Sequence, residues 1–513
     1  MSATESPSTG APTVDRSATA RLPSADRSAE GEDAQKAPPE GPGCFAMLAL
    51  FLGLGAVALA GVEYWQARWA WPVDPSWYRV EEADGKVTFG CQNYAPVQFY
   101  ADPPDGVTRI VLLGGSAAFG FPDRPVGETP ISHAAHGIGG AMQASLDSAW
   151  PGRFEVVNLG VNGGTSEDTL RLARRAMVWH PGALVVYDGN NEFMDVPRHM
   201  SPTLWRFALY RRATVLAERA DAAPGWVGPP AWSTAEAAGA VHARLERDLV
   251  AVADLARDAG VAVVFSTQAA NLADFDPSWS TAGDEATLRS LSTRSDPEVE
   301  ALWAATPDSA DLAWAVGQRR LAVGHDARAA LQAAVDHDGV AFRPTTAVND
   351  TIRAAARESG AALAEAEGAL GEAPPGGQSF YDWVHPRPEA AATIASTILV
   401  SLQGAKVIPG AAEAVEASPL PEADAAARDV RVAVSWLQWS CLRAHDPGFR
   451  LTHAESWAQD ALAVEPSNTM ALGILAVTPL LRDPAATLPN PLPDAVRMKL
   501  SGVHRCVGER LGG

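Results

Sequence analysis

Cysteine is scarce in this chain, with four residues among 513. So few cysteines cannot form the dense disulfide framework that holds small secreted domains together. No two of them follow the C-x-x-C spacing, so a zinc ribbon or a thiol redox pair is not indicated. Cys441 and Cys506 could pair in an oxidising compartment, and buried free thiols are an equally good interpretation.

Lysine is also scarce, with four residues against 36 arginines, and acidic residues outnumber basic ones to give a net charge of −21. Arginine in place of lysine, with abundant alanine, indicates the coding bias of a high-GC bacterial genome. The acidic balance argues against nucleic-acid binding, which needs clustered basic residues. A hydrophobic fraction of 47 % excludes a wholly disordered chain, and the length predicts two to four domains.

The first 43 residues lack hydrophobic periodicity and predict a disordered tail. No charged residue occurs from 41 to 62, a length that can cross a membrane, so we assign residues 44–64 to a single-pass anchor. Aromatic residues typical of a membrane interface open the juxtamembrane segment 65–107. A buried helix and a cleaved signal peptide are the alternatives, and the long acidic tail disfavours the second. The charges flanking the span do not determine its orientation, and from the anchor we expect a periplasmic or extracellular main domain.

Beyond the anchor, short apolar runs at 109–113, 155–159, 183–187 and 261–267 have the continuous character of strands buried on both faces. Helix-like segments at 131–149, 166–179 and 235–259 alternate with them. This alternation predicts a doubly wound, three-layer α/β domain with a parallel sheet over residues 108–403.

Two insertions interrupt this domain, a tryptophan-, arginine- and proline-rich one at 197–234 and an alanine-rich, helical one at 273–340. The second insertion and the helical region 425–513 carry small residues spaced as in tetratricopeptide hairpins. Ordinary amphipathic helix pairs explain the spacing equally well. Such C-terminal helices could bind a protein partner.

Three glycine-rich segments follow predicted strands, at the sheet edge where parallel α/β domains bind ligands. LLGGSAAFG carries Ser116, NLGVNGGTS carries Gly163, and YDGNNEF carries Asn191. A hydroxyl, a glycine N–H and a neutral amide at one edge are the groups that an acyl-transfer site needs. Each segment alone would be read as an ordinary turn.

A fourth segment, FYDWVHP, places Asp382 three residues before His385. At this spacing the carboxylate can hold one imidazole nitrogen while the other faces a hydroxyl.

Together, in this order, the four segments resemble the SGNH (GDSL-like) hydrolase family, as a membrane-anchored bacterial member. The resemblance implies that Ser116 is the nucleophile, His385 the base and Asp382 the residue that orients it. It also implies an oxyanion hole formed by Ser116, Gly163 and Asn191.

The chain departs from the family pattern at three points. Gly115 stands where the family has an Asp beside the nucleophile, and Glu192 stands where it has an Asp after Asn191. The glycine that usually follows the last block is also missing. None of these departures removes a catalytic group, and we expect Glu192 to anchor its loop.

We therefore expect a serine ester hydrolase, an esterase or deacetylase, acting on a small-molecule or polysaccharide ester. One alternative is an O-acyltransferase or deacetylase for cell-envelope polysaccharide, and another is a non-catalytic scaffold that binds protein partners. We expect no cofactor, because phosphate-loop and dinucleotide-binding motifs are missing. We expect no metal either, because His133 and His136 have no further ligand at a suitable spacing.

Overall fold

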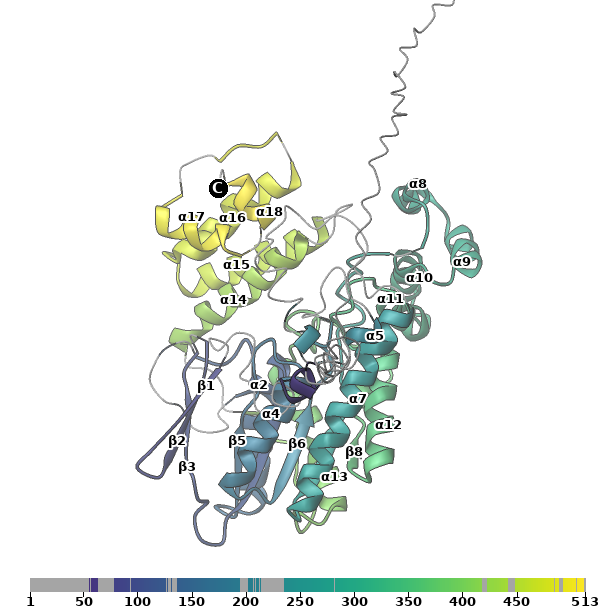
Figure 1. The fold of residues 1–513 in the computed structure, drawn as a ribbon. Helices are drawn as coiled ribbons and strands as arrows, with labels where there is room; N and C mark the ends of the chain where they lie inside the picture. Colours follow the sequence, from purple (N-terminus) through teal and green to yellow (C-terminus); the bar gives the residue numbers. More distant parts are fainter. Residues whose placement is uncertain are drawn as a thin grey trace, which may run out of the picture. The chain divides into compact units, whose positions relative to one another are not determined.

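A computed structural model of the chain describes residues 78–92, 94–125, 127, 131, 136–193, 235–280, 282–417, 422–441, 448–483, 485–488, 492–503 and 505–511, with 55, 57–62 and a few positions between 202 and 213 (Figure 1). The predicted tail lies outside these residues, as do most of the predicted anchor and most of the insertion 197–234. Among the residues described, no helix is both long and apolar enough to cross a bilayer. The chain divides into two units, Met1–Leu59 and Ala60–Gly513, and the second contains the sheets and the candidate site.

The centre of this unit is a five-stranded parallel sheet with the strand order β5-β4-β6-β7-β8. This order, second-first-third-fourth-fifth along the chain, is the flavodoxin-like form of the doubly wound fold, so the prediction of an α/β domain with a parallel sheet is confirmed. The sheet comprises β4 (Thr108–Gly114), β5 (Phe154–Asn158), β6 (Ala183–Tyr187), β7 (Ala262–Ser266) and β8 (Ala362–Ala364). The three-residue β8 was not predicted, because its short run does not stand out from the alanine-rich sequence around it.

Successive residues of β4 enter two separate cores, which explains the absence of polar alternation in the strands. Val111 and Leu113 pack in the core that includes residues of α4 (Ser166–Ala176), α7 (Ala235–Asp258) and α12 (Thr346–Ser359). Ile110 and Leu112 pack in the core that includes α3 (Gly137–Ala149) and α13 (Pro388–Gly404). Because each face of the sheet is covered, a strand gains from apolar residues at every position.

The predicted helix 131–149 begins later than expected, at Gly137 of α3. Ile131 instead forms a bridge with Val97, and His136 is the extended residue before the helix. Gly137 has φ +60°, a left-handed conformation that the chain adopts as it enters the helix. The predicted helix 166–179 is α4 followed by the 3-10 turn η1 (Met177–Trp179), and 235–259 corresponds to α7.

The described part of the segment 65–107 forms an unpredicted antiparallel sheet, β1-β2-β3. Its strands are β1 (Tyr78–Ala83), β2 (Lys86–Cys91) and β3 (Val97–Tyr100). Phe89, Val97 and Phe99 are buried in the core shared with α4 and α7, and the Phe99 ring meets Trp179 edge to face. Residues 78–100 are therefore part of the α/β unit.

Within the described part of 273–340 the structure has five helical segments, which begin at residue 285: α8 (Glu285–Arg289), η3 (Leu291–Thr293), α9 (Asp296–Ala305), α10 (Ala310–Ala322) and α11 (Arg328–Asp336). A Cβ on Gly317 of α10 would lie 2.4 Å from Leu331 of α11, so this glycine allows the two helices to approach closely. This contact explains the small-residue spacing as helix-pair packing, and a tetratricopeptide repeat stays a prediction.

The C-terminal region contains α14 (Glu422–Ser440), α15 (Gly448–Val464), α16 (Thr469–Arg482), α17 (Asp494–Ser501) and α18 (Arg505–Arg510). Ala454, Ala458 and Ala461 of α15 are fully buried, where α15 packs against α14. A disulfide joins Cys441 to Cys506 and so links the end of α14 to α18, which answers the question that the sequence left open.

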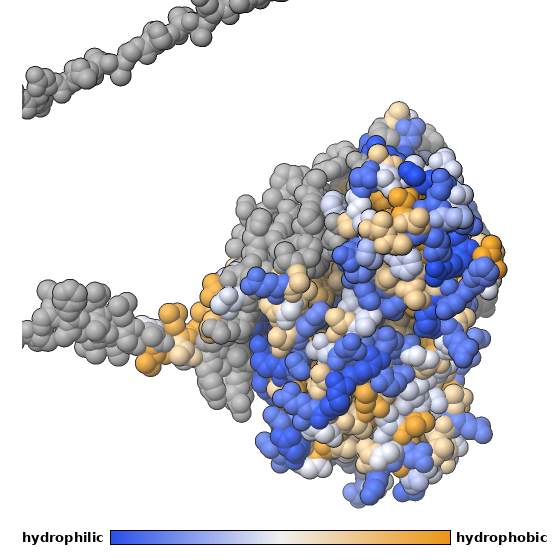
Figure 2. Space-filling view, turned by 90° about the vertical axis from the view of Figure 1, so that its right-hand side faces the viewer, coloured by the Kyte–Doolittle hydropathy of each residue, from blue (hydrophilic) through white to orange (hydrophobic). Residues whose placement is uncertain are grey.

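On the face of the molecule shown in Figure 2, hydrophilic residues predominate and apolar ones are scattered among them. Single apolar residues at a surface are ordinary in a folded protein. The coloured part of this face therefore gives no indication of a binding surface that would compete with the sheet edge.

Candidate active site

Ser116 is held in a tight strand-to-helix turn at the end of β4. Gly114 has φ +145°, and a Cβ there would lie 1.9 Å from the carbonyl oxygen of Tyr187 on the neighbouring strand, so only glycine fits. Helix α2 (Ser116–Phe119) starts at the serine itself. The sequence thus places this hydroxyl at the carboxyl edge of the sheet, as the motif predicts.

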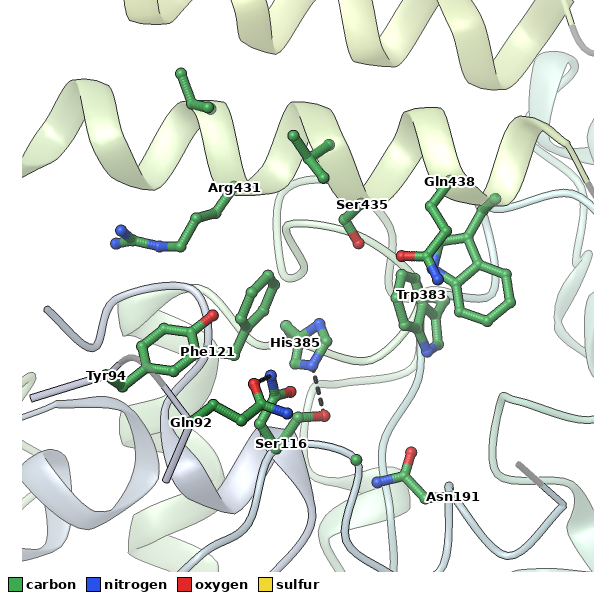
Figure 3. Close-up of a pocket in the computed structure, with 15 residues that line it drawn as sticks. Gln92, Tyr94, Ser116, Phe121, Asn191, Trp383, His385, Arg431, Ser435 and Gln438 are labelled. Atoms are coloured by element: carbon green, nitrogen blue, oxygen red, sulfur yellow. Dashed lines mark hydrogen bonds between the residues drawn. The ribbon is translucent and has the colours of Figure 1, made fainter. Parts of the chain in front are cut away.

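Ser116, His385 and Asp382 form a continuous hydrogen-bonded chain. Figure 3 shows the bond between His385 and Ser116. The Nε2 atom of His385 lies 2.7 Å from the Oγ atom of Ser116, and its Nδ1 atom lies 2.8 and 2.7 Å from the two carboxylate oxygens of Asp382. The Oδ1 atom of Asp382 also accepts the backbone N–H groups of Val384 and His385. Backbone N–H groups of the turn therefore fix the Asp382 carboxylate. The structure brings Ser116, His385 and Asp382, the three residues singled out in the sequence, into contact.

Asn191 presents its side-chain amide on the other side of Ser116 (Figure 3). The Nδ2 atom donates to the carbonyl of Gly164 at 2.8 Å, and the Oδ1 atom accepts from Asn190 at 2.9 Å. An amide nitrogen carries two hydrogens, so one N–H of Asn191 remains for a ligand. Gly163 lines the same pocket in a left-handed conformation (φ +78°). Within the described structure, the backbone N–H groups of Ser116 and Gly163 donate to no protein acceptor.

These groups line a pocket of about 390 Å³. The His385 ring meets Phe121 and Trp383 with ring centroids 4.5 and 5.2 Å apart, so the pocket beside the imidazole is largely aromatic. Sequence reasoning did not find these two residues, although Trp383 lies inside the FYDWVHP segment.

One wall of the pocket comes from α14, in the helical C-terminal region that the sequence suggested could bind a protein partner. The wall consists of Val430, Arg431, Val434, Ser435, Gln438 and Trp439. Their spacing of three and four residues identifies one helix face. That face was visible in the sequence, but nothing in the sequence indicated that it meets a site formed by the preceding domain.

Glu192, which follows Asn191 in the sequence, is a buried anchor for the Asn191 loop. It is fully buried and accepts from the backbone N–H and hydroxyl of Ser166 at 2.7 and 2.9 Å. It also pairs with Arg244 of α7 at 2.7 Å. Burial alone would lower the pKa of Arg244, but the carboxylates around it, Glu192 foremost, outweigh burial and raise it. The ion pair ties the Asn191 loop to α7.

Gly115, beside the proposed nucleophile, is required by the position of Asn191. A Cβ at residue 115 would lie 2.5 Å from the Nδ2 atom of Asn191. The aspartate that the family pattern has at this position would therefore collide with the amide in the arrangement seen here.

The described residues contain no group of three or more His, Cys, Asp or Glu side chains arranged to hold a metal ion. His133 lies outside the described residues. Burial, with the nearby Arg124 guanidinium, lowers the pKa of His136 to about 4.

No family model matches the chain, and no curated protein is significantly similar to it. Solved structures with some similarity include a GDSL-like lipase from Bacteroides thetaiotaomicron, 14 % identical, covering 58 % of this chain and 89 % of that one, with a TM-score of 0.28. An acetylxylan esterase from Geobacillus stearothermophilus is 12 % identical and covers 57 % of this chain and 94 % of that one, with a TM-score of 0.30. At these values the chemistry has to be argued from the geometry of the residues themselves.

Proposed function

We propose that this protein is a serine ester hydrolase that works through an acyl-serine intermediate. The observation that supports this most strongly is the chain from Ser116 through His385 to Asp382, which opens into a pocket beside three N–H donors. A scaffold that had lost its activity would have no need of this complete arrangement.

In the first half of the reaction, the Oγ atom of Ser116 attacks the ester carbonyl carbon while Nε2 of His385 takes its proton. Asp382 holds the imidazole in the tautomer that leaves Nε2 free to accept, and it stabilises the imidazolium that forms. The carbonyl oxygen becomes an oxyanion as the tetrahedral intermediate develops.

The oxyanion would be received by the N–H groups of Ser116 and Gly163 and by the Asn191 amide. Each such donor contributes about 2.7–4 kcal/mol of transition-state stabilisation. The intermediate collapses when the ester C–O bond breaks, and the leaving alcohol takes the proton from His385. Water then attacks the acyl-serine by the same route, which releases the acid and restores the serine hydroxyl.

The pocket volume of about 390 Å³ exceeds the needs of an acetyl group alone, so both the acyl group and part of the alcohol fit inside it. Small-molecule and acylated-sugar esters are the substrates that we propose. Attachment to a membrane through residues 44–64 stays a prediction from the sequence.

The test is hydrolysis of short aryl esters by the purified full chain in mild detergent, beside Ser116→Ala and His385→Ala. We expect saturable hydrolysis by the natural protein and loss of at least a thousandfold in kcat for either variant. Hydrolysis that is unchanged in Ser116→Ala would overturn the proposal. Thermal unfolding of each variant shows whether a loss of activity reflects a loss of folding.

A further inference from the structure

Helix α14 makes direct contact with both halves of the proposed catalytic machinery, although it lies outside the α/β domain in sequence. On the nucleophile side, the guanidinium of Arg431 donates twice to the carbonyl of Pro122, at 3.0 and 2.6 Å, a few residues after α2. On the acid–base side, the indole N–H of Trp436 donates to the carbonyl of Tyr381 at 3.0 Å. The helix thus holds the segments that carry Ser116 and Asp382.

A third contact reaches the catalytic carboxylate itself. The hydroxyl of Ser435 donates to Oδ2 of Asp382 at 3.2 Å, and Oδ2 is also an acceptor for His385 Nδ1. A serine inside a helix commonly bonds a backbone carbonyl one turn earlier, but this hydroxyl points out of the helix towards the triad (Figure 3). The hydroxyl is buried, so no bulk solvent replaces it freely.

The two oxygens of the Asp382 carboxylate are held in different ways. The Oδ1 atom accepts the N–H groups of Val384 and His385, which fix one end of the carboxylate. Oδ2 has no backbone donor among the described residues and depends on Ser435 for its second bond. Without that hydroxyl, the His385 Nδ1 contact is the one bond left at Oδ2 within the described structure, and the carboxylate is held less firmly against rotation about its Cβ–Cγ bond.

The C-terminal helices are attached firmly enough for this role. Arg450 of α15 is fully buried and donates to the carboxylate and carbonyl of Asp276, to the hydroxyl of Ser278 and to the carbonyl of Trp439 on α14. Asp276 and Ser278 lie at the start of the insertion 273–340 that follows β7, so one side chain joins this insertion, α14 and α15. Such a buried, fully bonded junction is costly to separate.

We propose that Ser435 is a positioning residue that orients the Asp382 carboxylate, and that α14 is a required wall of the active site. The proposal rests on the hydrolase function proposed above. On this proposal α14 forms part of the catalytic pocket, and binding of a protein partner by the C-terminal helices stays a prediction from the sequence.

The test compares Ser435→Ala with Ser435→Thr in the full chain, by kcat and KM for an aryl ester. Loss of the hydroxyl is expected to lower kcat about tenfold, the effect of one hydrogen bond, with KM within twofold. Threonine keeps the hydroxyl, and its methyl group can project into the pocket, so it should restore most of kcat. Ser440→Ala is the matched control, because Ser440 is a buried serine of the same helix that bonds only the carbonyl of Leu437.

A kcat for Ser435→Ala within twofold of the natural protein would overturn the proposal. So would a Ser435→Thr variant as slow as Ser435→Ala while both unfold at the natural temperature. A second readout needs no substrate: the proton between His385 and Asp382 gives a low-field resonance in proton NMR. That resonance should shift or broaden in Ser435→Ala and stay unchanged in Ser440→Ala. If the natural protein hydrolysed no ester, the proposed function would fail, while an unmoved resonance in Ser435→Ala would separately refute the positioning role.

Discussion

Replacing Gly115 with alanine tests the arrangement of the oxyanion hole with a single added carbon. The backbone at this residue has φ −80° and ψ −159°, which alanine adopts without strain. The added Cβ would lie 2.5 Å from Nδ2 of Asn191, closer than real contacts of this kind. This is the most severe contact of the new methyl group, since the next neighbour, the carbonyl oxygen of Gly164, would lie 3.3 Å away.

The amide cannot simply move aside at no cost. Asn191 is 3 % exposed, and its amide is held by bonds to Gly164 and Asn190. To clear the new methyl group, Nδ2 has to turn away from the pocket, which removes one of the three proposed donors. Loss of one such donor costs about 2.7–4 kcal/mol, so we expect kcat to fall by roughly 10²–10³ with KM little changed.

A double-mutant cycle shows whether the effect passes through the amide. In an Asn191→Ala background the methyl group meets no amide, so adding Gly115→Ala should lower kcat less than threefold. Gly239→Ala is the matched control, because Gly239 lies in α7 with open space around it. The reasoning is refuted if Gly115→Ala keeps kcat within twofold, or if its effect is the same in both backgrounds.

Three further predictions concern stability. Burial, together with the Glu192 carboxylate, raises the pKa of Asp188 well above its ordinary value. The folded state therefore holds this proton more tightly than the unfolded state, and the free energy of unfolding falls as pH rises above about 4. In urea unfolding, Asp188→Asn should have a higher free energy of unfolding than the natural protein at pH 8 and not at pH 3.5. Arg244→Met leaves the Glu192 carboxylate buried without its partner and should lower the free energy of unfolding by about 3–5 kcal/mol, and a loss below 1 kcal/mol would contradict the ion-pair account. Replacing Cys441 and Cys506 together by alanine opens a bridge between residues 65 apart and should cost about 4 kcal/mol, read as earlier urea unfolding of the C-terminal helices; an unchanged midpoint would show that these helices unfold independently of the bridge.

The parallel sheet and the grouping of Ser116, His385 and Asp382 could be predicted because their signals in the sequence are local. Each long strand is a continuous apolar run, and Asp382 and His385 lie three residues apart in the turn that joins them. The carboxyl ends of parallel strands lie at the same edge of a sheet. Ser116 and Asn191 each follow such a strand, so the sequence alone predicts that they lie near each other.

The features of the fold and of the candidate site that the sequence did not predict depend on contacts between distant parts of the chain. Ser435 lies 53 residues from Asp382, and only the packing of α14 on the α/β domain brings them together. The antiparallel sheet β1-β2-β3 was missed because its strands are short and follow an aromatic segment that suggested a membrane interface. The ion pair of Glu192 with Arg244 likewise joins two elements through the fold.

The central claim is that Ser116 is the acylated nucleophile, and covalent trapping tests it most directly. The full chain is treated with an aryl fluorophosphonate, a reagent that phosphonylates activated serines, and the modified peptide is identified by mass spectrometry. We expect one adduct, on the peptide containing Ser116, forming at least a hundredfold more slowly in His385→Ala and not at all in Ser116→Ala. An adduct on another residue, or labelling at the same rate in His385→Ala, would contradict the account.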